Sequence, residues 1–254
     1  MAKHARNVTA PPNAKVKATH PDPDPDFILP EARVVQCVFY SYNDPGIVPR
    51  SYAQVADRLL QEHGLELRLY KSNGACISIP GGQWSDFNDD AQIAAAMVAR
   101  AKKEVDPGSK FLPVIFCSIV KESNGTGETF PRPTNEKPTS TPGERYILLY
   151  VNRPSGDLVT LLHEIGHAAG HRAADGDIHD EWGIGNPDGR YSVMGTPGKV
   201  GGLFMGEDGA KNKHDMDNGR WARNTIYRPL VEKIAAAPWT VKASDCQLQR
   251  LNFP

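Results

Sequence analysis

The stretch LLHEIGHAAGH, residues 161–171, places three histidines and one glutamate among small and apolar residues. A helix of the protein core has no use for that many imidazoles, whereas a metal site does. We predict a helix over residues 155–170, with Ser155 or Asp157 near its N-terminus. Gly170 should end this helix, because glycine readily adopts the left-handed turn that redirects the chain.

His163 and His167 are four residues apart, which places both imidazoles on one helix face, about one turn apart. Glu164 points to the adjacent face, beside a metal ion rather than onto it. In this H-E-x-x-H arrangement the histidines bind Zn²⁺ and the glutamate is the general base for metal-activated water. A surface helix that carries histidines is the alternative. Because a catalytic zinc needs three protein ligands and one open position, a third ligand must be found.

The segment HEIGHAAG resembles the active-site helix of the metzincin zinc peptidases, whose pattern is H-E-x-x-H-x-x-G-x-x-H/D followed by a Met-turn. The segment GRYSVMGTPG (189–198) is similar to that turn, with Met194 beneath the metal; taken alone, Met194 would be an ordinary core methionine. The resemblance is specific over residues 163–198 and only topological over 32–236. It implies a zinc-dependent endopeptidase with a mixed sheet, an active-site helix, a C-terminal helix and an extended substrate cleft.

The third ligand of that family would fall at Ala173, which cannot bind metal. We therefore expect a lengthened loop with His179 as the third ligand, since imidazole suits zinc and Gly176 gives the loop freedom. His171 would lie about 12 Å from the first histidine along a straight helix, which disfavours it. The remaining candidates are Asp175, Asp177 and Asp180, whereas a distant Glu207 or His214 would indicate another branch of zincins.

Tyr191 lies three residues before Met194 and is a second catalytic candidate. A tyrosine hydroxyl could stabilise the oxyanion of a tetrahedral intermediate. In several metzincin branches the tyrosine instead follows the methionine, where this sequence has Gly195-Thr196-Pro197. A packing role is the simpler interpretation of Tyr191.

Strand and helix patterns alternate along the chain, which predicts an α/β fold of the α+β zincin-like kind. We expect a mixed twisted sheet with helices, an active-site helix and an irregular C-terminal subdomain ending in a helix. Asn73-Gly74 indicates a hairpin turn. The polar segment 121–144 reads as a long loop that borders the cleft. The expected strands cover 32–42, 65–71, 75–79, 110–120 and 145–152, and the other helices cover 51–64, 87–105 and 216–236.

Two regions are expected along the chain. Residues 1–28 alternate proline and aspartate near their end, which is typical of a disordered leader. Residues 29–254 should form one zinc metallopeptidase catalytic domain. Its upper lobe would cover about 29–170 and its lower lobe about 171–254, with a cleft between them.

Composition excludes several classes of function. The 254 residues include 29 basic and 30 acidic side chains, so nothing in the charge favours binding to nucleic acid or an anionic membrane. There is no apolar run of about 18 residues for a membrane span, and the N-terminus lacks the apolar core of a secretory signal. The compartment stays open, and export by a signal-independent route is one option. The four cysteines form no C-x-x-C pair, which argues against a cysteine zinc site.

The leading hypothesis is a zinc-dependent endopeptidase, a monomer that acts on protein or peptide substrates. A second hypothesis is a zinc hydrolase for cell-wall or other non-protein peptides, as in a bacterial effector or toxin. A third is a non-catalytic binding module in which zinc, closed by four ligands, holds the loop 171–181 in place.

Overall fold

The coordinates are a computed structural model of the chain. The leader up to residue 23 and the helix expected over 87–105, apart from Ala99, lie outside the residues that the structure describes. The described residues are 24–42, 48–78, 99, 110–117, 127–130, 142–150, 158–173, 178–179, 191–195 and 224–253.

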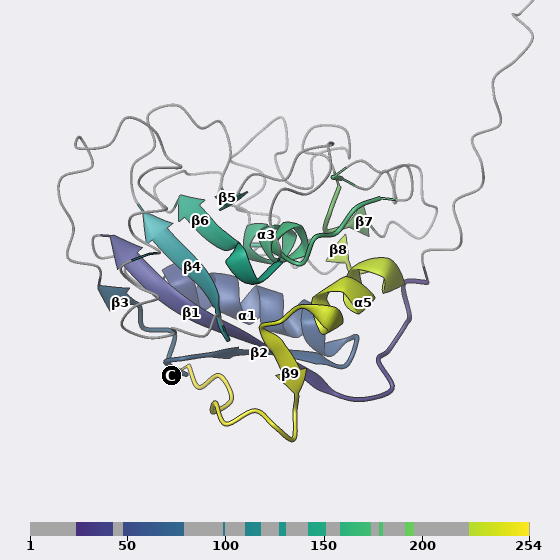
Figure 1. The fold of residues 1–254 in the computed structure, drawn as a ribbon, viewed down its shortest axis with the longest axis horizontal. Helices are drawn as coiled ribbons and strands as arrows, with labels where there is room; N and C mark the ends of the chain where they lie inside the picture. Colours follow the sequence, from purple (N-terminus) through teal and green to yellow (C-terminus); the bar gives the residue numbers. More distant parts are fainter. Residues whose placement is uncertain are drawn as a thin grey trace, which may run out of the picture.

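Within these ranges the centre of the fold is a seven-stranded mixed sheet (Figure 1). The first four strands of its main path are parallel, and the fifth, at one edge, is antiparallel to its neighbour. The predicted α/β fold class with a mixed sheet is therefore confirmed. In spatial order the path is β2 (Leu65–Leu69), β1 (Arg33–Tyr42), β4 (Leu112–Cys117), β6 (Tyr146–Tyr150) and β5 (Gly127–Phe130).

The long strand β1 has two neighbours on each of its edges. Its residues 33–35 pair with β2 on one edge and with the antiparallel β9 (Thr240–Lys242) on the other. Its residues 40–41 pair with β3 (Ile77–Ser78) and with β4 in the same way. The side chains from 34 to 41 are buried, as expected for a central strand that is covered on both faces.

The described helices are α1 (Val48–Gln61), α3 (Thr160–Ala168) and α5 (Arg228–Ala236). In α1, Tyr52, Val55 and Leu59 are buried with the spacing of one helix face, and the chain turns at Gly64 with φ 75°. Helix α3 contacts β5, β6 and both other helices. None of the helices in the described ranges has the length and apolar character needed to cross a membrane.

Helix α3 is enclosed by the rest of the protein along its whole length. All nine of its residues are buried, the histidines and the glutamate included. Leu161 and Ile165 belong to the same hydrophobic core as Met194 and Leu230, which lie far along the chain. The element that carries the H-E-x-x-H pattern is therefore a core helix and not a surface helix.

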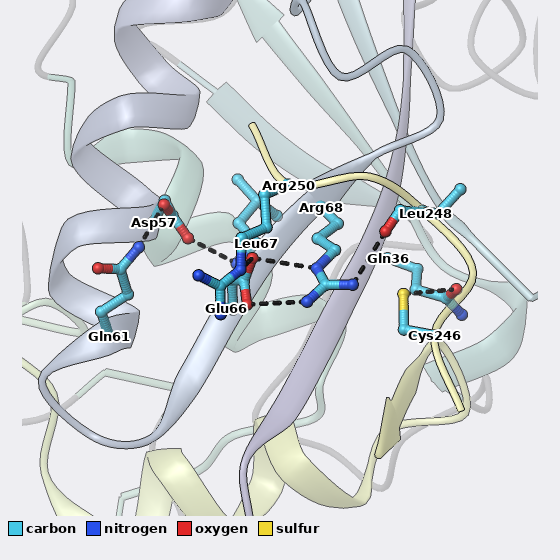
Figure 2. A network of polar contacts seen from close by, with 9 residues as sticks. All are labelled: Gln36, Asp57, Gln61, Glu66, Leu67, Arg68, Cys246, Leu248 and Arg250. Carbon is cyan, nitrogen blue, oxygen red and sulfur yellow. Dashed lines mark hydrogen bonds and ion pairs between the residues drawn. The ribbon is translucent and has the colours of Figure 1, made fainter. Parts of the chain in front are cut away.

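The chain after β9 returns to the sheet and is held there by polar contacts (Figure 2). The guanidinium of Arg68 on β2 donates two hydrogen bonds to Glu66 and one, of 2.9 Å, to the carbonyl oxygen of Leu248. The thiol of Cys246 lies 3.7 Å from the side-chain oxygen of Gln36 on β1. Part of the range expected to form the lower lobe therefore contacts the main sheet.

The prediction of a hairpin at Asn73-Gly74 is wrong. Strand β3 does not pair with β2 but lies parallel to β1. The side-chain oxygen of Asn73 accepts a 3.0 Å hydrogen bond from the backbone nitrogen of Ala75, and Gly74 has φ 74°. This side-chain turn lets the chain leave β2 without reversing along it.

The prediction of an uninterrupted loop over 121–144 is also wrong, because it contains the edge strand β5 and a short 3-10 helix, Pro142–Glu144. The last helix begins at Arg228 with Pro229 in its first turn, where a missing backbone N–H costs nothing. The short strand β8 (Asn224–Thr225) precedes it, inside the range expected to be helical.

Candidate metal centre

The two histidines of α3 face one another, as their spacing predicts. Their ring centroids are 4.6 Å apart, and the Nε2 atoms of His163 and His167 are separated by 3.0 Å. Both side chains are buried, with exposed fractions of 6% and 4%. The helix therefore presents two imidazole nitrogens to one point inside the protein.

His179, eleven residues beyond the helix, joins this pair. Its ring centroid lies 5.2 Å from that of His163 and 5.0 Å from that of His167. One ligand nitrogen from each of the three rings lies within 4.8 Å of the other two. These three histidines, which we call the histidine group, could hold a metal ion.

The geometry and chemistry of the histidine group suit a cation. Two ligands of a tetrahedral zinc, with bonds of about 2.0–2.1 Å, lie about 3.3 Å apart, close to the separation of the two Nε2 atoms. Burial lowers the pKa of His167 well below its usual value, and the neighbouring His163 and His179 lower it further. The ring therefore stays neutral, which is the form of imidazole that binds metal ions.

The orientation of the His163 ring is set by a backbone contact. Its Nδ1 atom lies 2.7 Å from the carbonyl oxygen of Val193. A carbonyl can only accept, so Nδ1 carries the proton and Nε2 keeps its lone pair for the histidine group. Such an outer hydrogen bond is the usual way in which a protein fixes the tautomer and the direction of a metal-binding histidine.

The residues around Val193 form a tight turn under α3. The backbone nitrogen of Gly195 donates to the carbonyl oxygen of Ser192 at 3.0 Å, and Met194 donates to the Ser192 hydroxyl at 3.1 Å. Met194 is fully buried, and a Cβ atom added to Gly166 would collide with its sulfur. The methionine therefore packs against the helix between its two histidines, at a place where only glycine leaves room.

The C-terminal end of α3 turns the chain as predicted. Gly170 has φ 79°, and the backbone nitrogen of His171 donates to the carbonyl oxygen of Gly166 at 3.0 Å. These are features of a Schellman motif, in which a left-handed glycine closes the helix. The buried Arg145 guanidinium donates to the carbonyl oxygens of His167 and Ala168. The first also accepts from the Gly170 nitrogen, whereas Arg145 is the described donor to the second.

Glu164 lies on the adjacent helix face and is also buried, with 5% of its surface exposed. Burial raises the pKa of its carboxyl to about 8, against the effect of a hydrogen bond from Thr129. The Thr129 hydroxyl lies 2.7 Å from Oε2 of Glu164 and 2.9 Å from its backbone carbonyl oxygen. A cation held by the histidine group would favour the charged carboxylate.

Among the other predicted site residues, only His171 has a described side chain. His171 is buried, with 2% exposed, but it is not a member of the histidine group. Tyr191 forms the short strand β7 (Tyr191–Ser192), and its side chain lies outside the described part of the structure. Five alternatives to His179 also lie outside it, namely Asp175, Asp177, Asp180, Glu207 and His214.

Two residues that contact the helix, Thr129 and Arg145, are not predicted from the sequence. Both contacts are non-local, because Thr129 meets Glu164 across 35 positions and Arg145 meets His167 across 22. The β-branched Thr129 and the aromatic Phe130 at the end of the segment GETF (127–130) are the one local signal of a strand, and both side chains are buried. Four residues are too few for that signal to be distinguished from a loop.

No protein-family model matches the chain, and no curated protein does so. The class of site is therefore defined by its geometry: a group of three histidines, two buried and one partly buried, that could hold a metal ion and is set in a mixed α/β fold. A buried carboxyl lies on the same helix as two of these histidines.

Proposed function

We propose that this protein is a zinc-dependent endopeptidase of the metzincin type with a divergent third ligand, His179. It would act as a monomer on protein or peptide substrates, with Glu164 as the general base. The observation that carries the proposal is the convergence of His163, His167 and His179, with the buried Glu164 beside them.

The ligand set supports zinc as the metal. Imidazole suits zinc, and three protein ligands with one open position define the catalytic zinc sites of proteins. The histidine group supplies three such ligands from two segments of the chain. When bound there, zinc would supply the Lewis acid that polarises a peptide carbonyl and makes water acidic near neutral pH.

The protein's own groups would do the rest of the chemistry. Glu164 would accept the proton of the attacking water and pass it to the leaving amine. Its carboxyl is buried and held by Thr129, so little further desolvation of the carboxylate would be needed when substrate binds. The hydrogen bond to Val193 keeps His163 in the tautomer that leaves Nε2 available.

Two further features support the metzincin type. Gly170 closes the active-site helix in the left-handed conformation, as the glycine of the family pattern implies. The turn Ser192–Gly195 places Met194 against the helix and the Val193 carbonyl against His163. The departure from the family is the position of the third histidine, six residues beyond Ala173.

Metal analysis combined with a substrate panel tests the proposal. The purified protein should bind one zinc and cleave unfolded protein, and Glu164→Gln should keep the zinc while activity falls at least about 100-fold. Glu232→Gln, an exposed carboxylate on α5, is the control and should cleave as fast as the parent. Cleavage by Glu164→Gln at the parental rate would contradict the role of Glu164.

The same panel separates the alternatives. Cleavage of peptidoglycan fragments without cleavage of unfolded proteins would indicate a hydrolase for cell-wall peptides. A zinc that has no exchangeable water, together with no hydrolysis of any substrate, would indicate a non-catalytic binding module with a closed site.

A further inference from the structure

We propose that Thr129 is a positioning residue: its hydroxyl fixes the direction of the Glu164 carboxylate beside the histidine group. The inference rests on the proposed function, in which Glu164 is the general base. It assigns a task to the edge strand β5, which the H-E-x-x-H pattern alone does not involve.

The contact joins one hydroxyl to two atoms of the same residue. The Thr129 oxygen lies 2.9 Å from the backbone carbonyl oxygen of Glu164 and 2.7 Å from its side-chain oxygen Oε2. A hydroxyl that spans the backbone and the carboxylate of one residue restricts the side-chain torsions between them. Thr129 is 2% exposed, so water does not compete for this hydroxyl.

Within the described residues, the carboxylate is therefore held at one oxygen only. Oε2 accepts the hydrogen bond from Thr129, whereas Oε1 accepts none from the residues that the structure describes. A general base needs one oxygen within about 2.6–3.2 Å of the proton that it removes. Fixing Oε2 leaves Oε1 in one defined direction for that purpose.

The placement of Thr129 follows from a match between β5 and α3. The two steps along the strand from Gly127 to Thr129 advance about 6.8 Å on one face, and the four steps along the helix from Thr160 to Glu164 advance about 6.0 Å. Because these advances are similar, Gly127 can lie against Thr160 while Thr129 lies against Glu164. A Cβ on Gly127 would lie only 2.9 Å from the Thr160 methyl carbon, which shows how closely the two elements approach.

The sheet holds β5 in this register. Thr129 pairs with Ile147 in the antiparallel ladder between β5 and β6, and Ile147 is fully buried in the core. A slip of one residue would turn the hydroxyl to the other face of the strand. Threonine is also β-branched, so its side chain is restricted to few rotamers even before it meets Glu164.

Thr129→Val tests the inference, because valine keeps the shape and removes the hydroxyl. We expect kcat on a protein substrate to fall about 10- to 100-fold, with KM and the zinc content unchanged. Thr129→Ser restores the hydroxyl and should return kcat to within a few-fold of the parent. Thr240→Val is the matched control, because Thr240 is also buried but its hydroxyl has no hydrogen-bond partner among the described residues.

A readout independent of catalysis comes from unfolding. Thr129→Val, Glu164→Ala and the double variant are unfolded in urea with the zinc-loaded protein. If the two side chains interact, the double variant shifts the midpoint by less than the sum of the single shifts. Thr240→Val combined with Glu164→Ala should be additive.

Each outcome decides a separate point. If the parent protein cleaves no substrate but the midpoint shifts are non-additive, the proposed function is wrong and the Thr129–Glu164 contact is established. Parental kcat in Thr129→Val overturns the positioning role, as does additive unfolding. Equal losses in Thr129→Ser and Thr129→Val would assign the effect to the packing of the threonine methyl group and would also overturn it.

Discussion

The Nδ1 atom of His163 lies 2.7 Å from the carbonyl oxygen of Val193, so helix α3 and the turn Ser192–Gly195 meet at a histidine of the candidate metal centre. A backbone carbonyl cannot be removed by substitution, which makes this contact insensitive to changes of side chain at position 193. Its integrity depends instead on how closely the turn approaches α3.

That approach is tested by Gly166→Ala. The new methyl group would collide with the Met194 sulfur and lie 3.1 Å from Leu230. Overpacking of this kind costs about 1–3 kcal/mol, more than the up to about 1 kcal/mol that alanine gains over glycine in a helix. We expect a lower free energy of unfolding and weaker zinc binding. In the control Gly143→Ala, the one described contact of the added methyl is Pro238, at 3.4 Å, and both measurements should stay near the parental values.

His179→Ala tests the third ligand. Loss of a direct ligand should lower zinc affinity by more than the about 10- to 100-fold typical of outer contacts. Zinc at about 100 times its Kd stabilises a folded protein by about 2.7 kcal/mol, so the parent should melt at a higher temperature when zinc is added and the variant should not. His171→Ala is the control, because His171 is buried outside the histidine group. A zinc response lost in His171→Ala and kept in His179→Ala would reverse the assignment.

Arg145→Met tests the closure of the helix. The substitution keeps apolar bulk but leaves the carbonyl oxygen of Ala168 without its described donor, whereas that of His167 keeps the bond from the Gly170 nitrogen. A buried unsatisfied acceptor costs about 1–3 kcal/mol, so the urea midpoint should fall clearly. Arg228→Met removes an exposed arginine that pairs with Glu232, and it should change the midpoint little. Equal effects of the two substitutions would show that Arg145 does not stabilise the helix end.

Asp57 predicts a pH dependence of stability. Burial raises the pKa of its carboxyl in the folded protein, despite hydrogen bonds from Leu67 and Gln61. The folded state therefore binds this proton more tightly: the contribution is complete below the unfolded pKa of about 3.9 and is lost as pH rises through the folded value. Asp57→Asn keeps an oxygen for the Leu67 nitrogen and cannot titrate. Urea unfolding from about pH 3 to about pH 7 should show the parent losing stability relative to the variant. If the parent instead becomes more stable relative to Asp57→Asn as pH rises, the predicted direction of the pH dependence is wrong.

Local rules were sufficient for the helix that carries the H-E-x-x-H pattern. The spacing of His163 and His167 places them on one face whatever surrounds them, and Gly170 closes the helix through its own backbone freedom. Strand β1 and helix α1 follow equally from short-range patterns of burial. These parts of the fold could be predicted because each sequence pattern lies within the same short stretch of chain as the helix or strand that it specifies.

The third histidine shows where local rules end. Several donors between 171 and 180 are chemically acceptable, and spacing cannot choose among them once the family position is Ala173. The structure brings His179 to the other two because of where the chain returns, which depends on packing rather than on composition. Thr129 was missed for the same reason, because its partner lies 35 residues away. The turn at Asn73 failed differently: one side-chain hydrogen bond redirected a dipeptide that otherwise favours hairpins.

The pairing of β9 with β1 has a consequence for folding during synthesis. Residues 33–35 leave the ribosome about 200 residues before their partners at 240–242, a delay of roughly 10–40 s at 5–20 residues per second. Helix α5, whose Leu230 lies beside Gly166, also emerges late. A nascent chain without these segments therefore cannot enclose the H-E-x-x-H helix, so the surroundings of the histidine group are complete only after residues 228–242 have been synthesised.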